Sequence, residues 1–260
     1  MGRLSTSKQQ KLVNSLANAW QTGQAMSYQQ ACELAPLTDE QAYQVQRELG
    51  EQLNWWPSGR PRAWKLATGV PPKMAPVPDE KLFFHDDKVQ HNSVTMCGVE
   101  VELVCQLKSS VHANMSSAEF AAAIDKTYAG IEVFDVRAKN WAELPNTFLL
   151  ADMQMHGALI LGDSVDGWQP ENELLISAGE VDLSMIDLKP QIPDLLVSLG
   201  WLSEHAEQQG WSLAAGDIIA TGSWCGLLEL PTGTELKACF TKVGSVSFTV
   251  NAETSRSANV

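Results

Sequence analysis

The chain has 260 residues, with 31 acidic against 18 basic side chains and a formal net charge of −13 at pH 7. This length allows one large domain or two small ones with a substantial core. The acidic balance disfavours nucleic acids and anionic membrane surfaces as partners, because both attract basic proteins. A small anionic substrate would need a bound cation or a local cluster of basic side chains to attract it.

The cysteines and the N-terminal sequence indicate the cellular compartment. Five cysteines without a Cys-x-x-Cys spacing disfavour a zinc site or a disulfide framework and favour reduced thiols. The N-terminal residues lack the apolar segment of a signal peptide, and no run approaches the roughly 20 apolar residues of a membrane span. We therefore expect a cytoplasmic protein with no membrane partner.

The first third of the chain has the periodicity of helices. From Gln9 to Thr22 apolar residues recur at helical spacing, and Gly23 is a suitable end. The capping-box sequence that begins at Thr38 predicts a second helix. The proline-rich connector that follows is predicted to be irregular and contains Pro71, Pro72, Pro76 and Pro78. We expect residues 1–75 to form a helical N-terminal cap and residues 76–260 to form one integrated β-rich core.

The rest of the chain alternates predicted strands with two predicted helices. Strand-like runs cover residues 99–107, 146–161, 216–222 and 235–250, and turn sequences that indicate hairpins lie at 215–217 and 231–234. One helix is expected from the capping box at Ser116 to about residue 128, with Gly130 as its end. The other is expected over about 193–209, with Gly210 as its C-cap. The excess of strands favours an α+β protein whose β-dominated core is closed or sandwiched, with helices outside.

Two acidic residues share one face of the predicted strand at 99–107. Because side chains alternate along a strand, Glu100 and Glu102 lie on the same side, roughly 6–7 Å apart. Adjacent like charges in an apolar strand are unfavourable unless a cation neutralises them, and a hard divalent ion bound by carboxylate oxygens meets that need. Glu132, in another apolar run, can complete a face of three carboxylates. The alternatives are a solvated strand face for the first two acids and an ion pair with Arg137 for Glu132.

Further residues are candidates for catalysis or for substrate binding. Lys65 stands between two apolar residues and can transfer a proton; it would be held cationic if it lay near the acids, and the alternative is an ordinary solvated lysine. Asp152 follows an apolar run and is a second catalytic candidate. The run Thr221-Gly222-Ser223 can offer N–H and hydroxyl donors to a substrate carboxylate, or can form only a tight turn. No HExxH motif, Ser or Cys triad signature or Gly-rich phosphate loop is present to support nucleophilic hydrolysis or nucleotide chemistry.

The order of these segments resembles the 2-keto-4-pentenoate hydratase branch of the fumarylacetoacetate hydrolase superfamily, which includes 2-oxohept-4-enedioate hydratases and 4-oxalocrotonate decarboxylases. The resemblance covers nearly the whole chain and rests on a helical N-terminus followed by five motifs. The motifs are Lys65-Leu66-Ala67, Glu100-Val101-Glu102, Glu132-Val133, the run from Gly216 to Gly222, and Val243-Gly244-Ser245-Val246. The chain departs from the family pattern at Ala67, where the family has glycine, and at Met153-Gln154-Met155, which follows Asp152 in place of an Asn-Ala-Ser-type sequence.

The resemblance implies a β-barrel-like fold of mixed sheets with Mg²⁺ or Mn²⁺ bound by Glu100, Glu102 and Glu132. The substrate would be a small anionic 2-oxo acid or its 2-hydroxy-dienoic tautomer. Lys65 would move a proton during tautomerisation, and water would add across the remote double bond. The expected activity is therefore that of a metal-dependent hydratase, and relatives of this kind assemble as homo-oligomers.

Three other activities remain open at this point. The first is decarboxylation of a 2-oxo diacid through the same kind of enolate. The second is C–C bond hydrolysis of an acylpyruvate, for which His85 with Asp86 or Asp87 is the nearby candidate for activating water. The third is a catalytically silent relative that serves as a binding or assembly protein, which the departures from the family pattern suggest.

Overall fold

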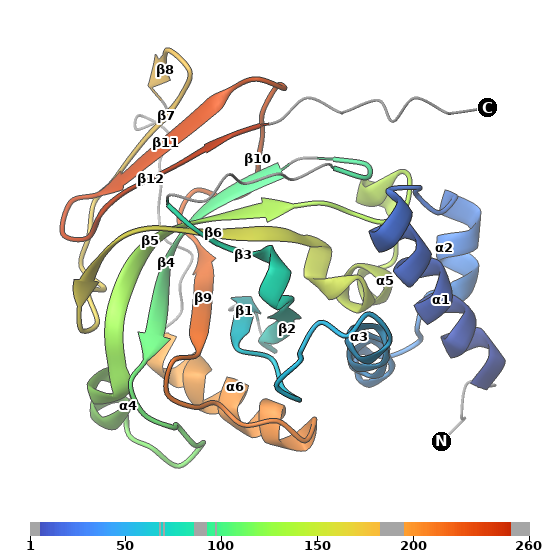
Figure 1. Ribbon diagram of the computed structural model, residues 1–260, viewed down its shortest axis with the longest axis horizontal. Coiled ribbons are helices and arrows are strands. Elements are labelled where there is room, and N and C mark those ends of the chain that lie inside the picture. Colours follow the sequence, from blue (N-terminus) through green and yellow to red (C-terminus); the bar gives the residue numbers. More distant parts are fainter. Residues whose placement is uncertain are drawn as a thin grey trace.

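The structure is a computed structural model that describes residues 6–67, 69, 71–85, 93–96, 98–182 and 195–250, without the side chains of residues 6, 7, 182 and 195–197. It combines a curled mixed sheet of eight strands, a second sheet of four strands and several helices (Figure 1). This arrangement confirms the prediction of an α+β protein with a β-dominated core. None of the described helices is long and apolar enough to cross a membrane.

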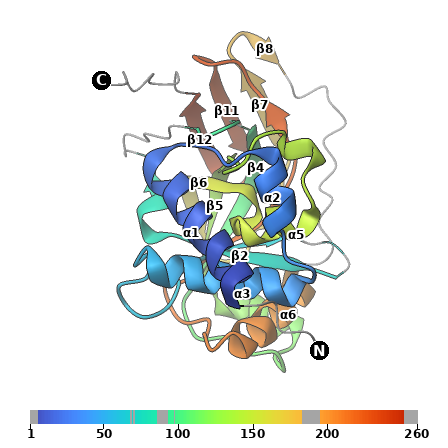
Figure 2. The ribbon, with the colours of Figure 1, turned by 90° about the vertical axis from the view of Figure 1, so that its right-hand side faces the viewer.

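Three helices make up the N-terminal part of the described chain. They are α1 (Thr6–Thr22), α2 (Tyr28–Leu34) and α3 (Asp39–Gln52). The first and third confirm the predicted helices, whereas α2 was not predicted. Thr38 caps α3 by accepting a hydrogen bond from the backbone N–H of Gln41, but the side chain of Gln41 accepts from Leu37 and leaves the capping box half formed. The three helices lie together at the right-hand end of the molecule in Figure 1 and face the viewer in Figure 2, and α1 packs against α2 and α3.

Residues 73–77 of the proline-rich segment form a strand, so the prediction of an irregular connector is wrong there, whereas Pro71, Pro72 and Pro78 lie outside the strands and helices. β1 (Ala63–Ala67) and β2 (Lys73–Val77) pair antiparallel, with Pro76 opposite Trp64. Proline is tolerated there because β2 is the edge strand of the large sheet and its outer side has no ladder to interrupt. β2 also spans residue 75, the predicted boundary between cap and core. The strand that carries Lys65, β1, pairs with β2 on one side and with β9 on the other, so it is part of the large sheet.

The large sheet has the strand order β2-β1-β9-β4-β5-β6-β3, and β10 pairs with β4. β1 runs parallel to β9 and β3 runs parallel to β6, while the other neighbours are antiparallel. The short helix η1 (Asp79–Lys81) precedes β3. The remaining strands of this sheet are β3 (Leu82–Phe84), β4 (Gly98–Leu107), β5 (Ile124–Phe134), β6 (His156–Asp166), β9 (Ile218–Ser223) and β10 (Leu228–Glu229).

The helix predicted to reach residue 128 ends earlier. α4 (Ser117–Ala123) starts with the predicted capping box, in which Ser116 and Glu119 bind each other's backbone N–H. β5 then begins at Ile124, and Gly130, the predicted helix end, lies inside that strand. Pairing with β4 and β6 on both sides of β5 outweighs the local helical signal, because strand preference depends on such neighbours.

The first part of the strand predicted over 146–161 is helical. The order is η2 (Trp141–Glu143), α5 (Asn146–Ala151) and η3 (Met153–Met155), and only the residues from His156 onward form β6. The apolar run Phe148-Leu149-Leu150 lies on α5. A short apolar run fits a buried strand and a buried helix equally well, so periodicity could not separate them.

The four-stranded sheet has the order β12-β11-β7-β8 and is antiparallel throughout. Its strands are β7 (Leu174–Ala178), β8 (Val181–Asp182), β11 (Glu235–Phe240) and β12 (Gly244–Thr249). The predicted turns at 215–217 and 231–234 are not hairpins, since one lies between a helix and β9 and the other joins strands of different sheets. α6 (Leu195–Gln208) confirms the last predicted helix, and Gly210 follows it with a left-handed φ of 79°.

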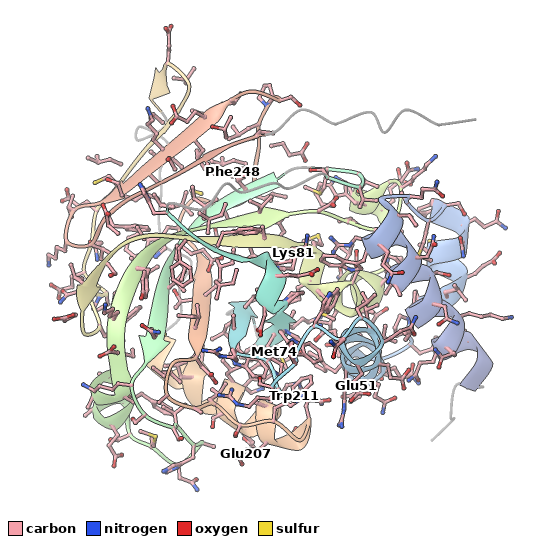
Figure 3. All side chains as sticks on the ribbon, viewed as in Figure 1. Glu51, Met74, Lys81, Glu207, Trp211 and Phe248 are labelled. Atoms are coloured by element: carbon pink, nitrogen blue, oxygen red, sulfur yellow. The ribbon has the colours of Figure 1, made fainter. Side chains whose placement is uncertain are left out.

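The two faces of β4 and β5 have different surroundings. One face packs against the four-stranded sheet, including Phe248 of β12, and consists of Val99, Val101, Leu103, Ala129, Ile131 and Val133. The other face carries Glu100, Glu102 and Glu132. A second apolar cluster among the helices includes Met74 of β2 and Trp211, whereas Glu51 and Glu207 are exposed on α3 and α6 (Figure 3).

Candidate metal centre

Three carboxylates meet on the face of β4 and β5 that points away from the four-stranded sheet. Glu100 lies directly opposite Glu132 in the antiparallel register, and Glu102 lies opposite Gly130, which has no side chain to compete for the space. One oxygen of each of the three glutamates lies within 4.8 Å of an oxygen of the others. Residues far apart in the sequence are thus brought into one cluster by the pairing of two central strands.

Backbone and side-chain donors hold two of these carboxylates in place. The backbone N–H of Gly222 donates to Oε2 of Glu102 at 2.9 Å. Oε1 of Glu132 lies 2.6 Å from Nζ of Lys65 and 3.1 Å from Nδ1 of His156. The alternative prediction, an ion pair between Glu132 and Arg137, is therefore wrong.

The cluster concentrates negative charge in a buried place. Burial and then the charge of Glu132 raise the pKa of Glu100 to about 7. Burial and the charges of Glu132 and Glu100 raise the pKa of Glu102 well above its ordinary value. Burial acts to raise the pKa of Glu132, but Lys65 and His156 lower it below its ordinary value. A divalent cation among the three glutamates would remove this repulsion, and an all-carboxylate donor set suits the hard ions Mg²⁺ and Mn²⁺.

Lys65 lies on β1 and faces the acids. Its side chain is buried, so the alternative of an ordinary solvated lysine is wrong. Nζ forms the ion pair with Glu132, donates to the backbone carbonyl of Gln154 at 2.8 Å and lies 3.9 Å from the centre of the Phe134 ring. All three partners interact favourably with an ammonium group, and together they hold the side-chain nitrogen of Lys65 beside the carboxylates.

The acids and Lys65 line one cavity of about 570 Å³. A ligand in it would have carboxylates, an ammonium group and apolar side chains within reach. The apolar lining includes Phe134, Leu149, Leu150, Met155 and Trp224. Lys73 of β2 and Asn146 of α5 add polar groups to the lining. A buried polar cluster with an apolar wall is the usual composition of a small-molecule site.

The three residues predicted to bind a substrate carboxylate have different surroundings. Ser223 lines the cavity. Gly222 also lines it, but its N–H donates to Glu102. Thr221 is fully buried, does not line the cavity, and donates its hydroxyl hydrogen to the backbone carbonyl of Leu103.

Asp152 lies apart from the acids. Its side chain is fully buried and does not line the cavity. Oδ1 accepts from Nε of Arg137 at 2.7 Å and Oδ2 accepts from the backbone N–H of Arg137 at 2.8 Å. The structure thus places Asp152, predicted to be catalytic, outside the cavity lining and in contact with Arg137.

His85 does not join the acids. It lines a second cavity, of about 470 Å³, together with residues of β7, β11 and β12. Asp86 and Asp87, its predicted partners, lie outside the described residues. The geometry of His85 thus gives no support to water activation at the carboxylate cluster.

Sequence reasoning missed the roles of two residues beside the cluster, the side chain of His156 and the backbone of Gln154. His156 is fully buried next to Glu132, and burial lowers its pKa. Gln154 contributes a backbone carbonyl, which any residue type can supply. Neither residue stands in a metal-ligand or catalytic spacing in the sequence, so only the three-dimensional arrangement reveals them.

Neither a protein-family model nor a curated protein matches the sequence. Among solved structures, 4-oxalocrotonate decarboxylase from Pseudomonas putida G7, complexed with magnesium and adipate, aligns with a TM-score of 0.74 and 17% identity over 95% of this chain and 98% of that chain. Fumarylpyruvate hydrolase from Pseudomonas aeruginosa, in complex with Mn²⁺ and pyruvate, aligns with a TM-score of 0.50 and 13% identity over 74% of this chain and 90% of that chain. For 2-hydroxyhepta-2,4-diene-1,7-dioate isomerase from Mycobacterium marinum the TM-score is 0.51 and the identity 15%, over 73% of each chain. This chain has the fold of the fumarylacetoacetate hydrolase superfamily, as its sequence motifs predict.

Proposed function

We propose that this protein is a divalent-metal-dependent lyase that hydrates a 2-hydroxy-dienoic or 2-oxo-alkenoic acid. The observation that carries the proposal is the meeting of three carboxylates and a buried lysine in one cavity with an apolar wall. The fold supports it, because solved structures of the same fold include a decarboxylase complexed with magnesium and a hydrolase complexed with Mn²⁺ and pyruvate.

In this proposal Glu100, Glu102 and Glu132 hold Mg²⁺ or Mn²⁺. The bound ion would supply Lewis-acid stabilisation to the 1-carboxylate and 2-oxygen of the substrate, and would let an acidic protein attract an anion. The backbone N–H of Gly222 orients Glu102 for this task, and His156 orients Glu132.

Lys65 is the proposed proton-transfer group. Its ammonium pairs with Glu132 and Lys65 lines the cavity, where the side chain can give a proton to the carbon chain of the substrate and take one back. The apolar lining orients that chain and excludes water from all but the reacting end. Ser223 is the proposed hydroxyl donor to the substrate.

Decarboxylation of a 2-oxo diacid is the second candidate. The structure of a 4-oxalocrotonate decarboxylase matches nearly the full length of this chain. Lys73, which lines the cavity and forms an ion pair with Asp39 at 3.3 Å, is the proposed cation for a second substrate carboxylate. Both reactions pass through an enolate, so the three glutamates and Lys65 would have the same tasks in each.

One experiment separates these candidates. The protein with Mg²⁺ or Mn²⁺ is incubated with a 2-hydroxy-dienoic monoacid and, separately, with an oxalocrotonate-type diacid, and water addition and CO₂ release are measured. Water addition supports the hydratase, and CO₂ release supports the decarboxylase. Metal binding without turnover of either acid would contradict both and favour a binding protein. Glu100→Gln is the control, and activity that persists in the chelated variant would refute a metal-dependent reaction.

A further inference from the structure

The turn that contacts Lys65 has an unusual backbone. Met153, Gln154 and Met155 are three consecutive non-glycine residues with left-handed φ values of 52°, 51° and 62°. Side chains with a Cβ disfavour this conformation, and it persists only where the surroundings enforce it. Such strained segments occur mainly at functional sites, so the contacts that enforce this one are informative.

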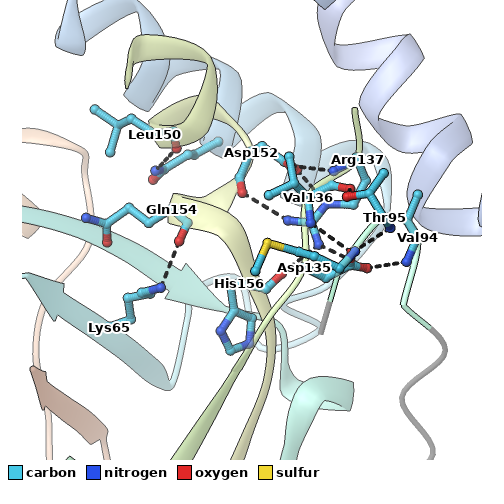
Figure 4. A network of polar contacts seen from close by, with 12 residues as sticks. Lys65, Val94, Thr95, Asp135, Val136, Arg137, Leu150, Asp152, Gln154 and His156 are labelled. Atoms are coloured by element: carbon cyan, nitrogen blue, oxygen red, sulfur yellow. Dashed lines mark hydrogen bonds and ion pairs between the residues drawn. The ribbon is translucent and has the colours of Figure 1, made fainter. Parts of the chain in front are cut away.

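Arg137 binds the residues on both sides of the turn (Figure 4). Its Nε donates to the Asp152 carboxylate at 2.7 Å, one terminal nitrogen donates to the backbone carbonyl of Asp152 at 3.1 Å, and the other donates to that of His156 at 2.8 Å. The guanidinium is almost fully buried and lies 4.1 Å from the centre of the Trp20 ring on α1. One planar group thus fixes the entrance and the exit of the left-handed turn.

This left-handed turn also fixes the position of the amine of Lys65. The backbone carbonyl of Gln154 accepts a hydrogen bond from Nζ of Lys65 at 2.8 Å. Oε1 of the Gln154 side chain has no hydrogen-bond partner among the described residues. The turn therefore contacts Lys65 through the backbone carbonyl of Gln154, and the direction of this carbonyl depends on the left-handed conformation.

We propose that Arg137 is a positioning residue that, with Asp152, holds the left-handed turn so that Gln154 and Glu132 together fix the amine of Lys65 beside the carboxylate cluster. This inference rests on the proposed function for its catalytic consequence. The geometric part, that loss of the Arg137 contacts releases the amine of Lys65, is independent of any activity.

The test compares Arg137→Lys with Arg60→Lys. Lysine keeps a buried positive charge beside Asp152 but cannot donate in several fixed directions at once. Arg60, which is partly exposed, also pairs with a buried aspartate, Asp217, elsewhere in the molecule, and one of its terminal nitrogens lies 2.7 and 2.9 Å from the two carboxylate oxygens. The second variant therefore controls for the loss of an arginine–aspartate pair as such.

The first measurement is the rate at which an amine reagent such as trinitrobenzenesulfonate labels Lys65, followed by peptide mass spectrometry. We expect Arg137→Lys to increase this rate severalfold relative to wild type and to Arg60→Lys, because the Gln154 carbonyl no longer retains the amine. Equal labelling in the two variants would overturn the inference. Since no turnover is measured, the result holds even if the proposed function fails.

The second measurement is the kinetic response to Arg137→Lys. Misplacing a proton-transfer group lowers kcat by about 10- to 100-fold. KM and the Mg²⁺ affinity should remain near wild type, because the hydrogen bonds and ion pairs of Arg137 go to Asp152, His156 and Asp135 and to none of the three glutamates. Equal losses of kcat and of Mg²⁺ affinity would overturn the inference in favour of general damage. If Arg137→Lys does not fold, Asp152→Asn replaces it, with smaller changes expected in the same direction; unchanged labelling and kcat in that variant would also overturn the inference.

Discussion

Replacing Glu100 with glutamine separates the electrostatic penalty of the acidic cluster from its proposed use as a metal site. Burial and then the charge of Glu132 raise the pKa of Glu100 from its ordinary 4.5 to about 7. Between these pH values the folded protein keeps a proton that the unfolded chain releases, so the stability of the folded state falls as pH rises from 4.5 through 7. Glutamine cannot ionise, and the variant therefore escapes this loss.

The pKa gives the size of the effect. A rise from 4.5 to about 7 corresponds to roughly 3 kcal/mol once the carboxylate is fully ionised. Because Glu100 is partly exposed, solvent screening reduces this to about 1–3 kcal/mol. We expect the chelated Glu100→Gln variant to exceed wild type in stability by this amount at pH 8, and by less than about 1 kcal/mol at pH 5.

Urea unfolding at pH 5 and pH 8, with a chelator or with added Mg²⁺, measures both parts of this prediction. Mg²⁺ should stabilise wild type at pH 8 and should leave the variant unchanged, since a ligand stabilises only the state that binds it. Glu80→Gln, at an exposed acid outside the cavity, is the matched control and should behave as wild type. A chelated Glu100→Gln variant that is less stable than wild type at pH 8 would refute the reasoning.

Three further predictions concern catalysis, specificity and packing. Lys65→Met should lower kcat by about 10²–10⁴-fold while Mg²⁺ still binds in calorimetry, because the three glutamates remain; near-normal turnover would exclude Lys65 as the proton-transfer group. Lys73→Met should raise KM for a 2-oxo diacid about tenfold, or roughly 1.4 kcal/mol, with little change for a monoacid; equal changes for both acids would mean that Lys73 does not recognise a second carboxylate. Gly162→Ala should destabilise the protein by about 1–3 kcal/mol in urea unfolding, because the added methyl group would collide with the backbone carbonyl of Ser245 on β12; an unchanged unfolding midpoint would contradict the close packing of β6 on β12.

Local patterns were sufficient for part of the site. The alternation of apolar and acidic residues in β4 places Glu100 and Glu102 on one face, because the period of a strand needs no information from other elements. The position of Glu132 opposite Glu100 depends on the register between β4 and β5. The apolar run around Glu132 and the resemblance of its motif to a known family indicated that it belongs with the other two, but neither gives that register. The helices α1, α3 and α6 were likewise predictable from periodicity and capping, whereas α2 was not.

Tertiary surroundings decided the rest. Pro76 forbids a central strand but not an edge strand, and the sequence does not say which strand is at an edge. Asp152 looked reactive because a carboxylate after an apolar run is unusual, yet its partner Arg137 stands on the segment after β5. The contact between Lys65 and Gln154 uses a backbone carbonyl, which leaves no trace in residue identity.

The placement of the acids in the middle of two paired strands has a consequence for how such proteins can diverge. Loss or gain of one residue within β4 or β5 would turn every later side chain of that strand to the opposite face, and would separate Glu100 from Glu132. The segments that border the cavity from outside the sheet, including α5 with Asn146, carry no such constraint on their length. Natural variants of this fold should therefore accumulate insertions and deletions in segments such as α5, which line the cavity from outside the sheet. The lengths of β4 and β5, which carry the three glutamates, should stay the same.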